Sequence, residues 1–409
     1  MPKSFERGIE RAADFLLREY GISLQTGFLP ESSLHRLPTN QGIPWQDKHF
    51  LLLDNIAHNL PDLIRAGKMQ ETVRLLPLPE QWPPPWLRED DPTTLRLMLI
   101  YEMTKHAYCR ERFPYESIHQ LTADKKKKFL PKQLAIPSYT LSQATGIAPS
   151  MSYFLYAPSN YFLGNPHAPH SFDNIEVLHT FSGTEDEKWF IKIHQGVDII
   201  LAGAIQNLMR AYIATATLDT ADLPPELITK WLENAARSSW EAFLLLKRMR
   251  EHCDYRTYFR NVRLFYSLPN NLVFRGVKEL ASRPQQIAGE TGGQDPGMHF
   301  RLAVLDVDYR DNAYFAQMRA HMPRRFRQLM ESVTTKCRVR EYVLTHREND
   351  ELVRQYNECV QTILAWRVEH RALAQDYIHA FGESHGTAKP PLGILDDLVE
   401  ATRGALILP

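Results

Sequence analysis

The segment DELVRQYNECVQTILAWRVEHRALAQDYIHAF, residues 350–381, carries the clearest helical pattern in the chain. Along it, apolar positions recur at steps of three and four residues, which is the spacing of one face of an α-helix. The stripe consists of Tyr356, Cys359, Val360, Ile363, Arg367, His370, Ala374 and Tyr377. This pattern predicts one long helix that packs its apolar face against a core, with an arginine and a histidine on that same face.

Shorter helical patterns fill much of the remaining chain. They predict helices over 45–60, 93–110, 188–215, 224–251, 255–266 and 312–333. Pro61 is expected to end or kink the first of these helices, and Pro323 to kink the last. Because no strand-like alternation of any length occurs, the predicted class is mainly α.

The length of the chain indicates more than one domain. With 409 residues it exceeds the ~250–300 at which a single core usually stops growing. The stretch 147–172 is rich in Pro, Ser, Asn and Tyr and has little periodicity, so we interpret it as a linker or an extended crossing between domains. We therefore predict a small N-terminal helical domain over 1–150 and a large all-α domain over 151–409.

The charge balance and the cysteine pattern argue against several classes of protein. Lys+Arg and Asp+Glu are both 48, so no global basic field exists to attract nucleic acid or an anionic membrane. The four cysteines form no CxxC pair, which argues against a disulfide framework or a zinc site. The first residues lack a signal-peptide pattern, and the longest apolar stretch, 197–208, is shorter than the ~20 residues of a membrane span. We therefore expect a soluble cytoplasmic protein without nucleic-acid or membrane partners.

Two motif-like stretches have both a functional and a structural interpretation. The lysines at 125–128 form either a nucleic-acid patch or a solvated turn, and the lack of aromatic interleaving favours the turn. The segment GETGGQDPG, residues 289–297, has paired glycines but no GxGxxG after a strand, so it is a poor dinucleotide site. Its free backbone N–H groups would instead suit a carboxylate.

His370 and Arg367 stand one helical turn apart on the apolar stripe. An arginine in such a place needs an anion, because an unpaired buried guanidinium is very costly. A histidine beside an arginine suits a haem, with the imidazole on the iron and the guanidinium on a propionate. From the spacing alone, the favoured interpretation is a hydrogen-bonded core histidine next to an arginine paired with an acidic residue.

Two further groups of residues are candidate site residues, and each also has a purely structural interpretation. His194 shares a helix face with Phe190 and Val197, so it is either a second inward histidine of one pocket or a satisfied core histidine. The end of the 255–266 helix carries Tyr258, Phe259, Arg263 and Phe265. These residues would line a pocket for an aromatic acid, or they would form an interface helix with one surface ion pair.

At these residues the chain resembles the indoleamine 2,3-dioxygenase family, whose members are haem enzymes. The resemblance runs through nearly the whole length in ordered blocks. They include EYGISLQTGFLP (19–30), LAIPSYTLS (134–142), VDIILAGAI (197–205), YFRNVRLFYS (258–267), GGQ (292–294) and YNECVQTILAWRVEHRALAQDYI (356–378). The order and number of the blocks make the resemblance stronger than any single motif.

The resemblance implies a mostly helical fold in which a small N-terminal domain caps a large haem-binding catalytic domain. It implies one haem b per chain, with His370 as the proximal iron ligand and Arg367 against a propionate. It places Tyr258 and Phe259 against an indole and Arg263 on the substrate carboxylate. It assigns further substrate contacts to Phe190, Thr291, Gly292, Gly386 and Thr387.

The departures from the family pattern concern the substrate side. His194 stands where the family has a small hydroxyl residue, so we interpret it as a catalytic residue that contacts the indole N–H or oxygen. Ser138 replaces a frequent tyrosine, and GTAKPP at 386–391 replaces a glycine-rich segment, which implies a stiffer lid. Tyr258 adds a hydroxyl to the usual aromatic pair. These changes leave the exact substrate open.

The expected function is that of a haem-dependent dioxygenase. It would open the indole 2,3-bond of L-tryptophan, or of a close indole, with O₂ to give N-formylkynurenine, as in tryptophan catabolism by the kynurenine pathway. An electron donor would reduce the haem. The alternative is a haem monooxygenase or peroxygenase that acts on an indole or phenol in secondary metabolism and uses His194. A non-enzymatic oxygen-binding or haem-sensing protein is a third possibility, which Arg263 disfavours.

Overall fold

The computed structural model describes residues 3–38, 44–78, 82–84, 87–89, 91–307 and 312–408. The helices of its N-terminal part are α1 (Lys3–Glu19), α2 (Pro44–His58), α3 (Leu60–Arg65), α4 (Met69–Leu75), α5 (Pro92–Arg112), α6 (Ile118–Ala123), α7 (Lys132–Thr145) and α8 (Tyr153–Tyr156). The helices that follow are α9 (Glu185–Thr217), α10 (Pro225–Leu246), α11 (Met249–His252), α12 (Tyr255–Thr257), α13 (Pro296–Val304), α14 (Ala313–Arg319), α15 (Arg324–Lys336), α16 (Val339–Thr345), α17 (Asp350–Tyr377) and α18 (Ile394–Arg403).

Short elements complete the described chain. A π-helical turn, η2 (Tyr258–Val262), lies among the 3₁₀ turns η1 (Thr220–Asp222), η3 (Arg263–Tyr266), η4 (Lys278–Leu280), η5 (Gly292–Gln294) and η6 (His379–Phe381). Strand β1 (Lys128–Leu130) pairs in parallel with β4 (Leu272–Phe274), and β2 (Tyr161–Leu163) pairs antiparallel with β3 (Ile175–Val177). Three-residue strands in two separate pairs leave helices as the main structure, so the predicted mainly-α class is confirmed.

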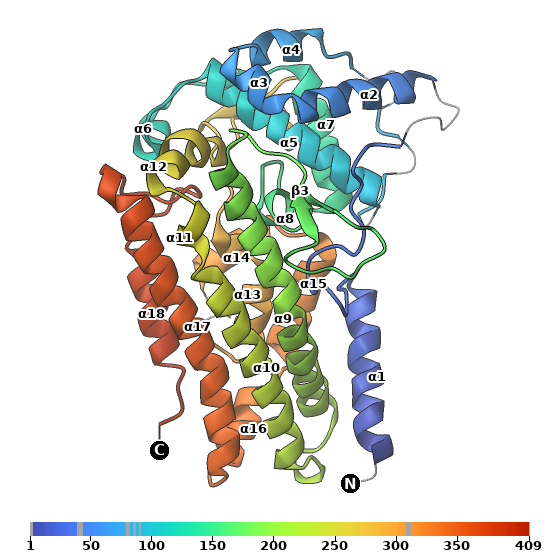
Figure 1. Ribbon diagram of the computed structural model, residues 1–409, viewed down its shortest axis with the longest axis vertical. Coiled ribbons are helices and arrows are strands. Elements are labelled where there is room, and N and C mark those ends of the chain that lie inside the picture. Colours follow the sequence, from blue (N-terminus) through green and yellow to red (C-terminus); the bar gives the residue numbers. More distant parts are fainter. Residues whose placement is uncertain are drawn as a thin grey trace.

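A row of long helices forms the body of the molecule. The helices α1, α9, α10, α17 and α18 lie side by side in that order, with both chain termini at one end of the row (Figure 1). Helices α2 to α7 gather at the other end. Buried apolar residues from both parts form one continuous cluster, from Ile9 to Ile407. The predicted division into domains at residue 150 stays a prediction.

The two longest helices begin where the local sequence favours it. Thr184 caps α9 by accepting a hydrogen bond from the Glu187 N–H at 3.3 Å, and the Glu187 carboxylate accepts from the backbone N–H groups of Phe181 and Ser182. This reciprocal arrangement satisfies N–H groups that a helix start leaves unpaired. Asn349 caps α17 in a similar way, at 3.0 Å from the Leu352 N–H.

Small residues allow α9 and α10 to approach closely. A Cβ on Gly203 would lie 2.6 Å from the Ser238 hydroxyl, and a Cβ on Gly196 would lie 2.7 Å from a methyl group of Leu245. Both distances are shorter than real contacts of a Cβ atom, so a larger residue at either position would force the neighbouring side chains to shift. The position of α9 matters because it carries Phe190 and His194.

Helix α5 is buried along almost its whole length and carries charged residues into the core. Arg96 pairs with Asp54 at 3.0 Å, and Lys105 pairs with Glu102 at 2.5 Å. Ser138 donates to Glu102 at 2.6 Å and accepts from Lys105 at 2.8 Å. Because a buried charge without a partner is strongly destabilising, Ser138 has a structural task here.

The helices predicted over 93–110, 188–215 and 350–381 are confirmed by α5, α9 and α17, and the other four differ, one of them in the site described below. The first, predicted over 45–60, is broken at Pro61 into α2 and α3, and its apolar face of Phe50, Leu53, Ile56, Ala57 and Leu60 is buried as expected. The helix predicted over 224–251 is interrupted after Leu246. The one predicted over 312–333 is two helices, because Pro323 starts a new helix instead of kinking one.

The stretch 147–172 is mostly irregular, as expected, but its first half is buried and contains one short helix, and its role as a linker or a crossing between domains stays a prediction. Tyr153–Tyr156 form α8, and all four residues are buried in the core. Ser152 caps this turn by accepting from the Leu155 N–H. A helix of four residues is too short to show helical periodicity in the sequence. Its formation therefore depends on the burial of its side chains in the core.

The lysine stretch and helix α9 have simple structural roles in the described chain. Lys125, Lys126 and Lys127 are exposed in a turn, as expected, whereas Lys128 is buried in β1 and bonds Asp124 at 2.6 Å. By length and composition α9 is apolar enough to cross a membrane, and 61 % of its most apolar window is buried inside the protein. A core helix passes the same test.

Candidate functional site

A deep cavity lies between α9, α17, α18 and the loops that precede α13 and follow η6. About 1440 Å³ of its space is free of protein atoms, part of it open to solvent. Its apolar wall includes Met298, Phe315, Trp366, Leu373, Ile378, Leu395 and Leu398.

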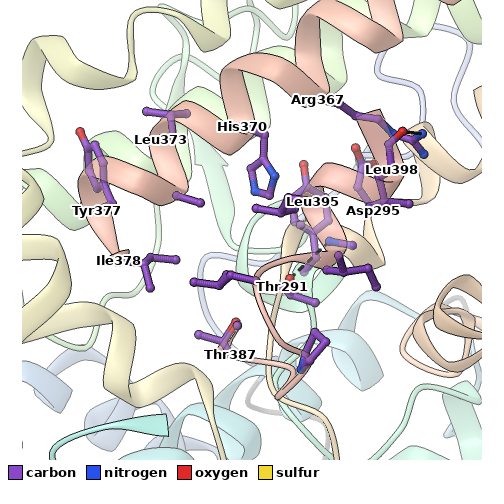
Figure 2. A pocket seen from close by; sticks show the side chains of 18 of the residues that line it. Thr291, Asp295, Arg367, His370, Leu373, Tyr377, Ile378, Thr387, Leu395 and Leu398 are labelled. Carbon is purple, nitrogen blue, oxygen red and sulfur yellow. Dashed lines mark hydrogen bonds between the residues drawn. The ribbon is translucent and has the colours of Figure 1, made fainter. Parts of the chain in front are cut away.

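His370 projects from α17 into this cavity, with Leu373 and Leu395 beside it and Thr291 and Thr387 across from it (Figure 2). Desolvation lowers the pKa of His370, so its imidazole is neutral near pH 7. Within the described chain no residue hydrogen-bonds to its ring nitrogens, although protein surrounds the cavity into which the ring opens. A neutral imidazole in this position is the form that binds iron.

Arg367 lines the cavity one turn before His370. Its Nη1 donates to the Leu398 carbonyl at 2.6 Å and to the Thr402 hydroxyl, so it joins α17 to α18. Its guanidinium also lies over the Phe315 ring, 5.7 Å from the centroid. These contacts hold the positive charge of Arg367 at the wall of the mostly apolar cavity, where it could pair with the carboxylate of a bound ligand. Its contact with a propionate stays a prediction.

The residues present therefore fit a haem. The cavity wall is mostly apolar, a neutral histidine without a hydrogen-bond partner among the described residues opens into it, and an arginine lines it one helical turn away. No group of three histidine, cysteine or carboxylate side chains among the described residues is arranged to hold a bare metal ion. A cofactor that brings its own four nitrogen ligands needs only the one imidazole.

His194 lines the same cavity from α9. Its Nδ1 lies 2.7 Å from the Phe190 carbonyl, which only accepts, so Nδ1 carries the proton and Nε2 holds a lone pair. Desolvation lowers the pKa of His194 to about 4. The structure thus combines the two interpretations of this residue: one nitrogen satisfies a backbone carbonyl, and the other is an acceptor.

The 255–266 segment is not the single helix that its pattern predicted. In the π-helical turn η2, the backbone N–H of Arg263 donates a hydrogen bond to the carbonyl of Tyr258, five residues earlier instead of the four of an α-helix. Residues five apart lie on one side of a π-helical turn, whereas an α-helix would separate them. Tyr258 and Arg263 consequently both line the cavity. Phe259 is not among the lining residues and stacks on Phe381, with centroids 4.3 Å apart, so its indole contact stays a prediction.

Arg263 is a buried cation with unused donors. Its Nη2 donates to the His385 carbonyl at 2.5 Å, while Nε and Nη1 make no hydrogen bond. Glu383 lies 3.7 Å from Nη1, but its oxygens already accept from the backbone N–H groups of Ile118 and Ser384. Desolvation lowers the pKa of Arg263 without neutralising it. The free edge of its guanidinium suits a carboxylate.

Thr291, Gly292, Gly386 and Thr387 line the cavity, as the sequence predicted, and their loops are tied together. The Thr387 hydroxyl donates to the Glu290 carbonyl, and the Ser267 hydroxyl donates to the Thr387 carbonyl at 2.6 Å. The Gly386 N–H bonds the Pro390 carbonyl at 2.9 Å. These contacts are consistent with the stiff lid expected from its prolines.

Gly289 makes this junction possible. A Cβ at this position would lie 2.3 Å from the Tyr266 carbonyl oxygen and 2.7 Å from that of Thr387. Only glycine allows three backbone segments to meet so closely, since the neighbouring atoms are backbone and have no room to shift.

Sequence reasoning missed the acidic residues of the cavity. Glu290, only 4 % exposed, and Asp295 both line it, and Asp198 accepts a long hydrogen bond from the Tyr153 hydroxyl at 3.4 Å nearby. Desolvation raises the pKa of Glu290 to about 8 and that of Asp295 to about 6. A carboxylate in a polar, glycine-rich loop is normally expected to be exposed to solvent. Apart from its position inside GETGG, the sequence therefore gave no indication that Glu290 lines the cavity.

Replacing Glu290 with glutamine is expected to raise the melting temperature at about pH 9 more than at about pH 5. Since the pKa of this carboxyl is raised from 4.5 to about 8, its stabilising contribution is present below the unfolded value and is lost as pH rises through about 8. At roughly 1.4 kcal/mol per pKa unit the loss reaches several kcal/mol, and glutamine does not titrate. Thermal melts of both haem-loaded proteins at the two pH values measure it. An equal shift at both pH values would contradict the raised pKa.

The fold and the cavity define a class: a mainly helical haem-binding protein whose cofactor slot opens onto a pocket with a cation for a carboxylate. The comparisons with known proteins agree with that class. Residues 16–390 match the family model described as indoleamine 2,3-dioxygenase. Since this match covers most of the chain, the protein belongs to the indoleamine 2,3-dioxygenase family.

Individual relatives show how broad the family is. Indoleamine 2,3-dioxygenase 1 of Rattus norvegicus is 30 % identical over 376 residues, covering 89 % of this chain and 84 % of the relative. A 6-hydroxytryptophan 2,3-dioxygenase of Fusarium equiseti is 23 % identical over 373 residues, covering 88 % and 85 %. A myoglobin of Haliotis madaka is 21 % identical over 378 residues, covering 90 % of each chain.

Family membership confirms the predicted cofactor and the predicted class of enzyme. The protein is a haem-dependent dioxygenase of the oxidoreductase class, with haem b as its cofactor. The individual roles of His370, Arg367, His194 and the substrate contacts stay predictions, because their support is the geometry described above.

Proposed function

We propose that the enzyme inserts both atoms of O₂ across the 2,3-bond of L-tryptophan, or of a close indole, to give N-formylkynurenine. The observation that carries this proposal is the free edge of Arg263 in the same cavity as His370 and His194. An aromatic amino acid meets these requirements, because its carboxylate pairs with the guanidinium while its ring reaches the haem side of the pocket. The names of the rat and Fusarium relatives both designate dioxygenases of indoles.

Each side chain then has a defined task. Haem, when held by His370, supplies the chemistry of O₂. Arg263 fixes the substrate carboxylate through two N–H donors. The rings of Tyr258 and Phe190, whose centroids are 5.0 Å apart, flank the place for an aromatic ring. His194 accepts the indole N–H at Nε2. The protein's contribution is orientation, which reduces the entropy lost on reaching the transition state.

We also propose that the enzyme acts in tryptophan catabolism in the cytoplasm and that an electron donor keeps its haem reduced. Its four cysteines are all free and buried, as suits a reducing compartment. The balanced charge, 48 basic against 48 acidic residues, supports a protein that works without a nucleic acid or membrane surface.

Binding of the substrate can be tested by titrating L-tryptophan into the ferrous protein with carbon monoxide bound. We expect the Soret band to shift saturably, because the ring of the substrate enters the pocket beside the haem. Imidazole-free buffer and D-glucose serve as blank titrations. A Soret band that does not respond to L-tryptophan or any other indole would favour an oxygen-binding protein, the kind of relative that the Haliotis myoglobin represents.

A second candidate function is supported by His194. A histidine above the haem is also suited to move a proton during O–O cleavage, as a monooxygenase or peroxygenase of an indole or phenol requires. The lone pair on Nε2 is compatible with that role as well. The two functions differ in what the loss of the imidazole does.

Replacing His194 with serine is expected to leave an active dioxygenase that discriminates less against 1-methyltryptophan. The substitution removes the imidazole that accepts from the indole N–H and puts a shorter side chain in its place, so the methylated ring, which cannot donate, is penalised less. Values of kcat/KM for both substrates in wild type and variant measure the change. A loss of activity by ~10²–10⁴, the usual worth of a positioned acid–base group, would favour the second function. If the variant keeps the same selectivity between the two substrates but has a lower melting temperature, His194 has only a structural role in the core.

A further inference from the structure

We infer that Glu290 binds the α-ammonium group of the substrate, so that the pocket selects a zwitterionic amino acid through two opposite charges. This inference rests on the proposed function, because it takes Arg263 as the partner of the substrate carboxylate. It assigns the second charge of the substrate to a residue that the sequence did not single out.

The backbone of Glu290 is fixed on both sides of the residue. Its N–H donates to the Tyr266 carbonyl at 3.0 Å, and its own carbonyl accepts the Thr387 hydroxyl. The preceding Gly289 is wedged between the same two segments. A side chain that starts from so rigid a junction has a defined direction, which a binding residue needs.

The side chain of Glu290 is buried, lines the cavity and has no partner. It is 4 % exposed, and no residue in the described ranges donates a hydrogen bond to its carboxylate or forms an ion pair with it. Two other buried carboxylates, Asp54 and Glu102, each have a cationic partner, and Glu187 accepts several hydrogen bonds instead. An unpaired carboxylate facing a cavity is costly unless a ligand brings the cation.

The groups on which an ionised Glu290 would act include four tyrosine hydroxyls. Its charge contributes to raising the pKa of Tyr153, Tyr258, Tyr266 and Tyr314, which come from α8, η2, η3 and α14. All four are neutral near pH 7, so none of them would compensate the charge of Glu290 once its carboxyl is ionised.

Tyr258 connects the two proposed charge sites. Its hydroxyl lies within electrostatic reach of both Glu290 and Arg263, which act on its pKa in opposite directions. Glu290 and Arg263 form no ion pair with each other in the structure. They line the same cavity without contacting each other, as the partners of an ammonium and a carboxylate on one α-carbon must.

Three ligands separate the two charges experimentally: L-tryptophan, indole-3-propionate, which lacks the ammonium, and tryptamine, which lacks the carboxylate. We would measure the dissociation constant of each from the Soret shift of the ferrous carbon monoxide form. The proteins are wild type, Glu290→Gln, Arg263→Ala and the control Glu187→Gln, a buried carboxylate that does not line the cavity. Haem content and melting temperature are recorded for each.

We expect Glu290→Gln to weaken L-tryptophan and tryptamine by ~10–150-fold, the range of a charge-assisted hydrogen bond, and to leave indole-3-propionate unchanged or tighter. Arg263→Ala should weaken L-tryptophan and indole-3-propionate and spare tryptamine. Equal weakening of all three ligands by Glu290→Gln would make the residue a structural or ring contact and overturn the inference, as would no weakening at all. Failure of wild type to bind any of the ligands would instead contradict the proposed function.

Discussion

Replacing His370 with alanine is expected to abolish the Soret band of the purified protein and to reduce turnover by at least ~10³-fold, since the cofactor carries the chemistry. The imidazole of His370 is neutral, opens into the apolar slot and has no protein partner among the described residues. Without the imidazole, only the apolar side chains of this part of the cavity and, as predicted, Arg367 would hold the haem on that side. Haem content by the pyridine haemochrome method and the ligand-field spectrum measure the effect.

Two controls make this result specific. His379→Ala, an exposed histidine on η6 near the end of the same helix, should keep a full complement of haem. Imidazole added to His370→Ala should restore part of the Soret band, because it can occupy the place of the lost side chain. Normal haem content and an unchanged spectrum in His370→Ala without imidazole would show that another residue holds the iron.

Replacing Arg263 with alanine is expected to lower the affinity for L-tryptophan by ~10–150-fold while haem content stays normal. The guanidinium is buried, and its Nε and Nη1 have no hydrogen-bond partner, so they are available to a ligand. A charge-assisted pair contributes about 1.5–3 kcal/mol, which sets the size of the loss. The Soret titration of the ferrous carbon monoxide form measures the affinity.

Two further variants distinguish the charge of Arg263 from the shape of its guanidinium group and test whether the effect is specific to this position. Arg263→Lys keeps the charge but not the planar fork, so its affinity should lie between those of wild type and alanine. Arg260→Ala removes an exposed arginine from the same π-helical turn and should bind tryptophan normally. If tryptophan titrates unchanged into Arg263→Ala, the carboxylate is held elsewhere and the proposed pose is wrong.

The parts of the fold that periodicity defines could be predicted from the sequence. The stripe on 350–381 gave a helix whose buried face includes Tyr356, Ile363 and Arg367, and the same stripe directed His370 into the cavity. Repeats of three and four residues report burial directly, because one side of a helix must pack. Pro61 likewise marked the break between α2 and α3, since a proline ring is not tolerated inside a helix.

Features that depend on contacts between distant segments could not be predicted in this way. The π-helical turn at Tyr258–Val262 sets which aromatic residue reaches the cavity, and no local pattern distinguishes it from an α-helix. It turns Phe259 toward Phe381 and away from the lining. Glu290 is buried only because Gly289 lets the loop press against Tyr266 and Thr387, which are remote in sequence.

The most direct test of the account is product analysis by mass spectrometry after the ascorbate- and methylene-blue-reduced enzyme turns over L-tryptophan under ¹⁸O₂. Opening of the 2,3-bond consumes one O₂ per indole and places both of its atoms in the product as two carbonyl oxygens, so we predict N-formylkynurenine carrying two ¹⁸O atoms. The product must be analysed rapidly, because carbonyl oxygens exchange with water. A hydroxylated or oxindole product with a single ¹⁸O atom would contradict dioxygenation and establish the monooxygenase alternative.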